Sequence, residues 1–301
     1  MGTTKNPSPK IKVPKNSQEN RTLKEGLIED DNDDIAYLNF QLIWPVSAMS
    51  LVSVFFMALA VSTMEVLPHL EGSPTAGVRV ATYGRVATLC NNTNPFEDGM
   101  YPSILRQAEM KVTVNVFFRV SVCVPMAIRI FLAMVIRNSF RDEYLCATKS
   151  DFLWFLNELT TVLSAVEALC LALFSIITIR FDYPDVYRYS FCTFIFSTIM
   201  HMYLRTILSF TTTENTIKLL DKISMSVKCV SAIIFSWMAS QFFYFHQDFI
   251  GHVTCHGYVH YWNAINEYCL ILAYLFFNLT FIIDIRDLRF ICYPRTSSGE
   301  C

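Results

Sequence analysis

Long apolar runs alternate with short polar segments along most of the chain. Six runs reach about 20 residues or more, the length that an α-helix needs to cross the hydrocarbon of a bilayer. No stretch shows the alternating pattern of a membrane-spanning β-strand. The runs are 42–64, 112–136, 152–178, 189–209, 224–245 and 262–283. The pattern predicts an all-α polytopic membrane protein with about six transmembrane helices.

The polar segments divide the chain into three parts. Residues 1–40 form an N-terminal tail that is rich in proline and charge, and we expect it to be disordered. Residues 41–284 form the six-helix transmembrane domain, with a long loop at 65–111. Residues 285–301 form a C-terminal tail. Charged residues make up only 17% of the chain, which fits a protein that turns most of its surface toward lipid.

The distribution of Lys and Arg predicts the orientation. The two tails and the connections 137–151 and 210–223 together hold fourteen basic residues, whereas the other three connections hold six. Basic residues favour the cytosolic side. We therefore expect both termini to be cytosolic and the loop 65–111 to be lumenal.

The expected lumenal side carries two candidate modifications. Asn91 begins an Asn-Asn-Thr sequon and is a candidate glycosylation site. A second sequon at Asn20, in the expected cytosolic tail, argues weakly for the opposite orientation. Cys90 and Cys255 both fall on the expected lumenal side, where a disulfide between them would tie the first long loop to the last connection.

Ionisable residues lie inside several of the predicted spans, where they are costly and are candidates for function. With a rise of 1.5 Å per residue, Arg119 and Glu267 lie at similar depths near the lumenal edge and could form a pair. Glu167 and His201 both lie near the middle of their spans. Three further charges gather toward the cytosolic side: Arg129, Arg205 and Glu158.

These charges have a structural and a functional interpretation. The structural interpretation is that they form pairs that only hold helices together. In the functional interpretation, Arg119, Arg129 and Glu267 line a cavity for a lipid phosphate, because a guanidinium offers a planar fork of donors. His201, oriented by Glu167, would then be the catalytic base toward a hydroxyl group.

The connection before the last span holds four histidines and Cys255, which invites a metal-site interpretation. Gly251 and Gly257 break the helical spacing of these histidines, and a zinc site needs a supported constellation of ligands. We therefore favour a polar loop and predict neither a metal nor another cofactor. The net charge of −2 gives no indication of nucleic-acid binding.

Six segments, in order and with matching spacing, resemble the post-GPI-attachment-to-proteins factor 2 family, of the FRAG/DRAM/Sfk group of six-span membrane proteins. The segments are Cys90 followed by Met100-Tyr101-Pro102-Ser103-Ile104; Arg119 and Arg129; Ser164-Ala165-Val166-Glu167; Phe194-Ile195 and His201-Met202; Cys255 and Glu267-Tyr268; and Asp284. The chain departs from the family in its longer histidine-rich loop, in its N-terminal tail, and at Asn278, where the family has a histidine.

The resemblance implies a role in the maturation of GPI-anchored proteins, in the Golgi membrane or the endoplasmic reticulum membrane. The implied reaction is the reattachment of a fatty acid to lyso-GPI, so GPI-anchored proteins and lyso-GPI are the expected partners. Whether the chain is itself the acyltransferase is left open by the sequence. The alternatives are a non-catalytic lipid-binding or scaffold protein that aids the transport of GPI-anchored proteins, and a membrane regulator or transporter like other members of the wider group.

Overall fold

The computed structural model describes residues 38–64, 100–141, 151–177, 183–211, 219–251, 257–286 and 288–292. The candidate residues Asn91, Cys90 and Cys255 lie outside these ranges. The chain divides into two compact units. The first combines residues 1–42 with residues 287–301, and its described part is an antiparallel pair of strands, β1 (Leu38–Gln41) and β4 (Arg289–Cys292).

The second unit, Ile43–Arg286, contains six helices that are long and apolar enough to cross a membrane, which confirms the predicted fold class. Each helix overlaps one of the six predicted runs. The helices are α2 (Ile43–Ser62), α6 (Val112–Cys123) continuing as α7 (Met126–Phe140), α9 (Asp151–Ile176), α10 (Pro184–Thr211), α11 (Leu219–Gly251) and α12 (Tyr261–Asp284).

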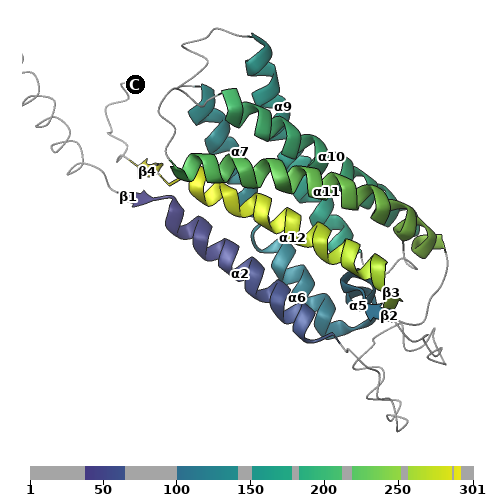
Figure 1. Ribbon diagram of the computed structural model, residues 1–301. Helices are drawn as coiled ribbons and strands as arrows, with labels where there is room; N and C mark the ends of the chain where they lie inside the picture. The colour runs from purple at the N-terminus through teal and green to yellow at the C-terminus, as the bar shows by residue number, and fades with distance from the viewer. Residues whose placement is uncertain are drawn as a thin grey trace, which may run out of the picture. The chain divides into compact units, whose positions relative to one another are not determined.

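Helices that follow one another in the chain pack side by side in the second unit (Figure 1). α2 packs on α6, α7 on α9, α9 on α10, α10 on α11 and α11 on α12, and α12 also contacts α2. The helices therefore form a closed ring, and its interior contains side chains and cavities. The end of the bundle where α10 begins is called the α5 end, after the short helix α5 (Ile104–Met110). The opposite end is called the Asp284 end.

The segment 65–111 is predicted to be a loop, but its last part, from residue 100 onward, forms a strand and a helix. β2 (Met100–Pro102) pairs antiparallel with β3 (Tyr258–His260), and α5 (Ile104–Met110) follows. Ser103 caps α5, because its hydroxyl accepts a hydrogen bond from the backbone N–H of Arg106. These elements are too short for a membrane-length search to detect. They fix the first residue of α12 against the segment before α6.

A proline and two serines hold α2 against α6. Pro125 has no N–H, so the carbonyl of Ser121 loses its helical partner four residues on. Ser53 of α2 replaces that partner: its hydroxyl donates to the Ser121 carbonyl at 2.7 Å, and the Ser121 hydroxyl donates to the Ser53 carbonyl at 2.8 Å. The break between α6 and α7 is therefore satisfied by a neighbouring helix, as the bilayer requires.

Replacing Ser53 by Ala is expected to loosen this junction. The freed Ser121 carbonyl has no water to bind in hydrocarbon, so we expect a loss of about 0.6–2 kcal/mol in the free energy of unfolding. The measurement is thermal unfolding in detergent, followed with a thiol-reactive dye that reports the partly buried cysteines 123, 170, 192, 229 and 269. Ser62→Ala, on the same helix but exposed and bonded only within its own turn, is the control and should leave the midpoint unchanged.

Candidate functional site

The bundle encloses a large apolar cavity. It holds about 1150 Å³ of space not filled by protein atoms, its mouth included, and is lined mainly by aliphatic and aromatic side chains of α2, α6, α7, α9, α10 and α12. It extends from Glu267, near the α5 end, to Asn278 and Phe281. Because nearly all of its lining is apolar, this space suits an apolar chain.

A smaller, polar cavity adjoins the first toward the Asp284 end. It holds about 450 Å³, its mouth included, and shares Arg129, Leu132, Asn278 and Phe281 with the apolar cavity. Its other polar lining comes from α7, α9 and α10: Arg137, Asn157, Thr160, Thr161, Ser164, His201 and Arg205. Among the described side chains that line it, none is acidic. An amphiphile with an anionic head and an apolar chain matches the two cavities together.

Four polar side chains meet where the two cavities adjoin, and we call them the central cluster. Glu167 is 1% exposed and accepts three bonds: one from the Arg129 guanidinium on Oε1, one from the Tyr274 hydroxyl on Oε1 at 2.7 Å, and one from Nδ1 of His201 on Oε2 at 2.7 Å. The expected contact between Glu167 and His201 is therefore present. Arg129, expected toward the cytosolic side with Arg205 and Glu158, pairs with Glu167.

The helical repeat explains how these residues reach one place. On α9, Asn157, Thr160, Ser164 and Glu167 recur every three or four residues, so they share one face, and all four are buried. Facing helices supply the opposite charges. A carboxylate surrounded by lipid-facing helices is tolerable only when it is paired, and here one cation and two neutral or ionisable donors pair with it.

The arrangement fixes the tautomer of His201. Because the Glu167 carboxylate can only accept, Nδ1 of His201 carries a hydrogen, so in the neutral ring Nε2 is the basic nitrogen. The ring is held by Phe277 and Phe281, whose centroids lie 5.9 and 6.2 Å away. His201 also lines the polar cavity. A neutral imidazole oriented by a carboxylate in this way can take a proton from a hydroxyl group.

Tyr274 is a member of the cluster that the sequence interpretation missed. Its hydroxyl donates to Glu167, and its ring lies 5.1 Å from the Arg129 guanidinium carbon. The available signal was spacing rather than charge. Glu267, Tyr274 and Asn278 lie seven and then four residues apart, on one face of the last span.

Tyr274→Phe is expected to remove one hydrogen bond to a buried carboxylate and little else. We expect the unfolding free energy to fall by about 1.5–3 kcal/mol, the usual worth of a bond to a charged group. Thermal unfolding in detergent measures it. Tyr203→Phe on α10, whose side chain is 41% exposed, is the matched control. Equal midpoints for the two variants would show that the Tyr274 hydroxyl does not support the cluster.

Arg119 and Glu267, expected to form a pair, have different partners. Arg119 donates from Nε to the Ser175 carbonyl at 3.1 Å and from Nη2 to the Ile176 carbonyl at 2.8 Å, at the end of α9. Glu267 accepts from the backbone N–H of Leu105 at 2.7 Å. Its other oxygen, Oε2, is buried without a hydrogen-bond partner in the described part of the chain. Glu267 also lines the apolar cavity.

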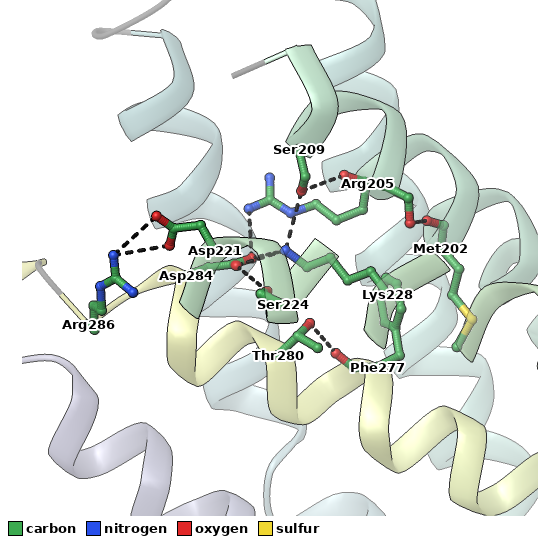
Figure 2. Close-up of polar contacts among 11 residues, drawn as sticks. Met202, Arg205, Ser209, Asp221, Ser224, Lys228, Phe277, Thr280, Asp284 and Arg286 are labelled. Atoms are coloured by element: carbon green, nitrogen blue, oxygen red, sulfur yellow. Dashed lines mark hydrogen bonds and ion pairs between the residues drawn. The ribbon is translucent and has the colours of Figure 1, made fainter. Parts of the chain in front are cut away.

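A second ionic cluster lies at the Asp284 end, and Figure 2 shows how its side chains converge. Lys228, 1% exposed, places Nζ 2.7 and 2.6 Å from the two carboxylate oxygens of Asp284. Ser224 donates to the same carboxylate at 3.1 Å, and Arg205 approaches it at 3.5 Å. Two cations thus share one carboxylate, and Arg205 connects this cluster to the polar cavity.

The histidine-rich connection is divided between several environments. His246, expected in the loop, lies in α11 instead and is 2% exposed. One of its ring nitrogens forms a hydrogen bond with the Tyr187 hydroxyl at 3.0 Å, and its ring packs on Phe191 and Phe242. Its aromatic neighbours extend the helix beyond the predicted end at residue 245. His260 is exposed in β3, and residues 252–256 lie outside the described ranges. Within the described ranges, no three metal-ligating side chains converge.

Comparison with known proteins identifies a family that this chain matches. Residues 44–288, which include nearly all of the six helices, match the family model described as "Frag1/DRAM/Sfk1/Cwh43P N-terminal domain". A Caenorhabditis elegans protein with the name "Uncharacterized protein C14B9.3" is 38% identical over 294 residues, covering 97% of this chain and 84% of that protein. No solved structure matches the chain.

Proposed function

Because the chain belongs to the Frag1/DRAM/Sfk1/Cwh43P family and has six membrane-crossing helices, we propose that it remodels the lipid of GPI anchors by adding a fatty acid to lyso-GPI. The observation that carries the proposal is the position of His201: its ring is held by the Glu167 carboxylate where an apolar and a polar cavity adjoin. A base in that position would lie beside the ester region of a bound lipid, between its acyl chains in the apolar cavity and its head group in the polar cavity.

The proposed reaction uses Nε2 of His201 as the base. A glycerol hydroxyl of lyso-GPI gives its proton to Nε2 while its oxygen attacks the acyl carbonyl carbon of a donor. A new ester C–O bond forms, the bond between the acyl carbon and the donor's leaving group breaks, and Nε2 returns the proton to that leaving group. Glu167 stabilises the imidazolium that exists between these two proton transfers. The Arg129 guanidinium, which lines both cavities, is proposed to hold a phosphate beside the reacting hydroxyl.

The proposed orientation places the α5 end in the lumen and both termini in the cytosol, with the protein in the Golgi membrane or, alternatively, in the endoplasmic reticulum membrane. Lyso-GPI lies in the lumenal leaflet, so it would enter from the α5 end. Arg119 is ten residues, or about 15 Å of helix, nearer that end than Arg129. It is therefore proposed to meet the lipid phosphate at entry, with Glu267, at the same end of the apolar cavity, accepting a bond from a lipid hydroxyl.

The test is rescue in cells that lack this protein. The acyl composition of a GPI-anchored reporter is measured after expression of the wild-type chain or of an empty vector. The proposal expects the wild-type chain to restore an anchor with two fatty acids. A reporter that keeps a single chain at matched expression of the wild type would reject the remodelling function.

A non-catalytic lipid carrier is the second candidate, and one observation favours it. Glu167 is bonded by three groups from three different helices, as a purely structural hub would be. A carrier needs the cavities and the arginines but no base. His201→Ala would then still rescue the reporter, whereas the acyl-transfer proposal expects it to fail.

A further inference from the structure

Arg205 has a buried donor that nothing in the described part of the chain satisfies. Its Nη2 approaches Asp284 at 3.5 Å, a long contact, and its guanidinium carbon lies 5.9 Å from the Phe281 ring. The Nε–H is buried and has no hydrogen-bond partner there. Buried donors are nearly always paired in folded proteins, so an unpaired one at a cavity wall indicates where a ligand atom binds. The atom required is an acceptor.

Among the described residues, the charges of the ion pairs around the polar cavity do not balance. Each lining arginine has an acidic partner outside the lining, but one of these partners is shared with Lys228. In these described ion pairs four cations share three carboxylates: Arg129, Arg137, Arg205 and Lys228 with Glu167, Glu158 and Asp284. An uncompensated charge within a membrane is costly. A bound anion would remove that cost.

We propose that the polar cavity binds the phosphate of an acylated lipid, whose acyl chain lies in the adjoining apolar cavity, and that this molecule is the acyl donor. Arg205 and Arg137 bind the phosphate oxygens from two sides of the cavity, and the asparagine and hydroxyl side chains of α9 supply neutral donors. The phosphate completes the bonding of the Arg205 Nε–H. None of these residues is needed to hold lyso-GPI at Arg119.

The spacing of the lining residues favours a glycerophospholipid. His201 and Arg205 are one turn apart on α10, a separation of about 6 Å along the axis. In a glycerophospholipid only the glycerol carbons separate the ester carbonyl from the phosphate, so the two can meet His201 and Arg205 together. An acyl-CoA is also an acylated molecule with phosphates, but a much longer linker separates its acyl carbonyl from them.

The donor step balances as a transesterification. The ester C–O bond of the phospholipid breaks at the acyl carbon, and the acyl group passes to the lyso-GPI oxygen. The proton that Nε2 of His201 took from lyso-GPI goes to the glycerol oxygen of the resulting lysophospholipid. This donor role rests on the proposed acyl transfer, but the binding of phosphate in the polar cavity does not.

The test uses the full-length purified protein in detergent and native mass spectrometry with three probes: dioleoyl phosphatidic acid, oleoyl-CoA and dioleoylglycerol, which has no phosphate. Arg205→Gln removes the orphan donor and its charge. Ala133→Phe fills the polar cavity from α7 without changing a charge, and covers the case in which Arg205→Gln fails to fold. Met134→Phe makes the same addition on the lipid-facing side of α7 and is the control, because Met134 is 53% exposed.

The expected result is retention of phosphatidic acid by the wild type and by Met134→Phe. Affinity should be about tenfold lower in Arg205→Gln, which loses one charge-assisted bond. It should also be reduced in Ala133→Phe, because the added ring occupies the space of the phosphate. The same dependence with oleoyl-CoA alone would support the site and identify the phosphate source as CoA. Equal retention of dioleoylglycerol, or phosphatidic acid binding that neither variant weakens, would overturn the site. Binding as expected, without passage of a labelled oleoyl chain to lyso-GPI, would overturn the acyl transfer and leave the site standing.

Discussion

Glu167→Gln is expected to lower the free energy of unfolding by about 3–5 kcal/mol, the range seen when one partner of a buried ion pair is removed. The variant leaves the Arg129 guanidinium, whose side chain is 17% exposed, without its carboxylate. It also weakens the bonds from His201 and Tyr274. Thermal unfolding in detergent measures the loss, and acyl transfer should fall as well, because the tautomer of His201 is no longer fixed.

The chain contains a matched control for this prediction. Glu158 and Arg137 form the same type of ion pair between the same two helices, α9 and α7, but their side chains are 25% and 34% exposed. Glu158→Gln should therefore cost only about 0–1 kcal/mol. The double variant Glu167→Gln, Arg129→Gln should be less destabilised than the sum of the single variants, because no buried charge is left alone. Equal losses at Glu158 and Glu167 would contradict the claim that burial makes the central cluster costly to break.

Asp284→Asn should have an effect of similar size at the Asp284 end. Lys228 is almost fully buried, and Asp284 supplies both of its contacts shorter than 3 Å (Figure 2). Removing the carboxylate leaves Lys228 and Arg205 facing each other without compensation. We expect a loss of about 3–5 kcal/mol in unfolding free energy and a strongly reduced yield of folded protein.

Two further variants separate charge from packing in this cluster. Adding Lys228→Met to Asp284→Asn removes the stranded ammonium and should recover at least half of the lost stability. Asp221→Asn breaks the nearby pair with Arg286, in which Asp221 is 42% exposed, and should cost about 0–1 kcal/mol. A double variant no more stable than Asp284→Asn would show that the loss comes from something other than the unpaired lysine.

The fold class followed from the sequence because the bilayer imposes one requirement on every span. Each must satisfy its own backbone over about 30 Å, so six long apolar runs give six helices. The strands β2 and β3 and the helix α5 were missed because nothing in a run of three to seven residues meets that criterion. His246 was assigned to a loop because histidine is polar, although its aromatic neighbours bury it in α11.

The candidate site was only partly accessible from the sequence. Depth along a helix is linear in residue number, so Glu167 and His201 could be placed at one level before their contact was known. Rotation and the order of the helices are not linear in sequence, which is why the pairing of Arg129 with Glu167 could not be predicted. Tyr274 was overlooked because it carries no charge. The cavities are gaps in side-chain packing, and no residue pattern marks where packing stops.

The central claim is that His201 is the base of an acyl transfer inside the membrane. The most direct measurement is transfer of a labelled fatty acid from phospholipid to lyso-GPI by purified protein in vesicles. It compares the wild type with His201→Ala and with His260→Ala, a histidine exposed in β3 and outside the site. The account predicts transfer by the wild type and by His260→Ala, and a rate at least about a hundredfold lower for His201→Ala, the lower bound for the loss of a general base. Transfer by His201→Ala at the wild-type rate, or none by a folded wild type, would contradict it.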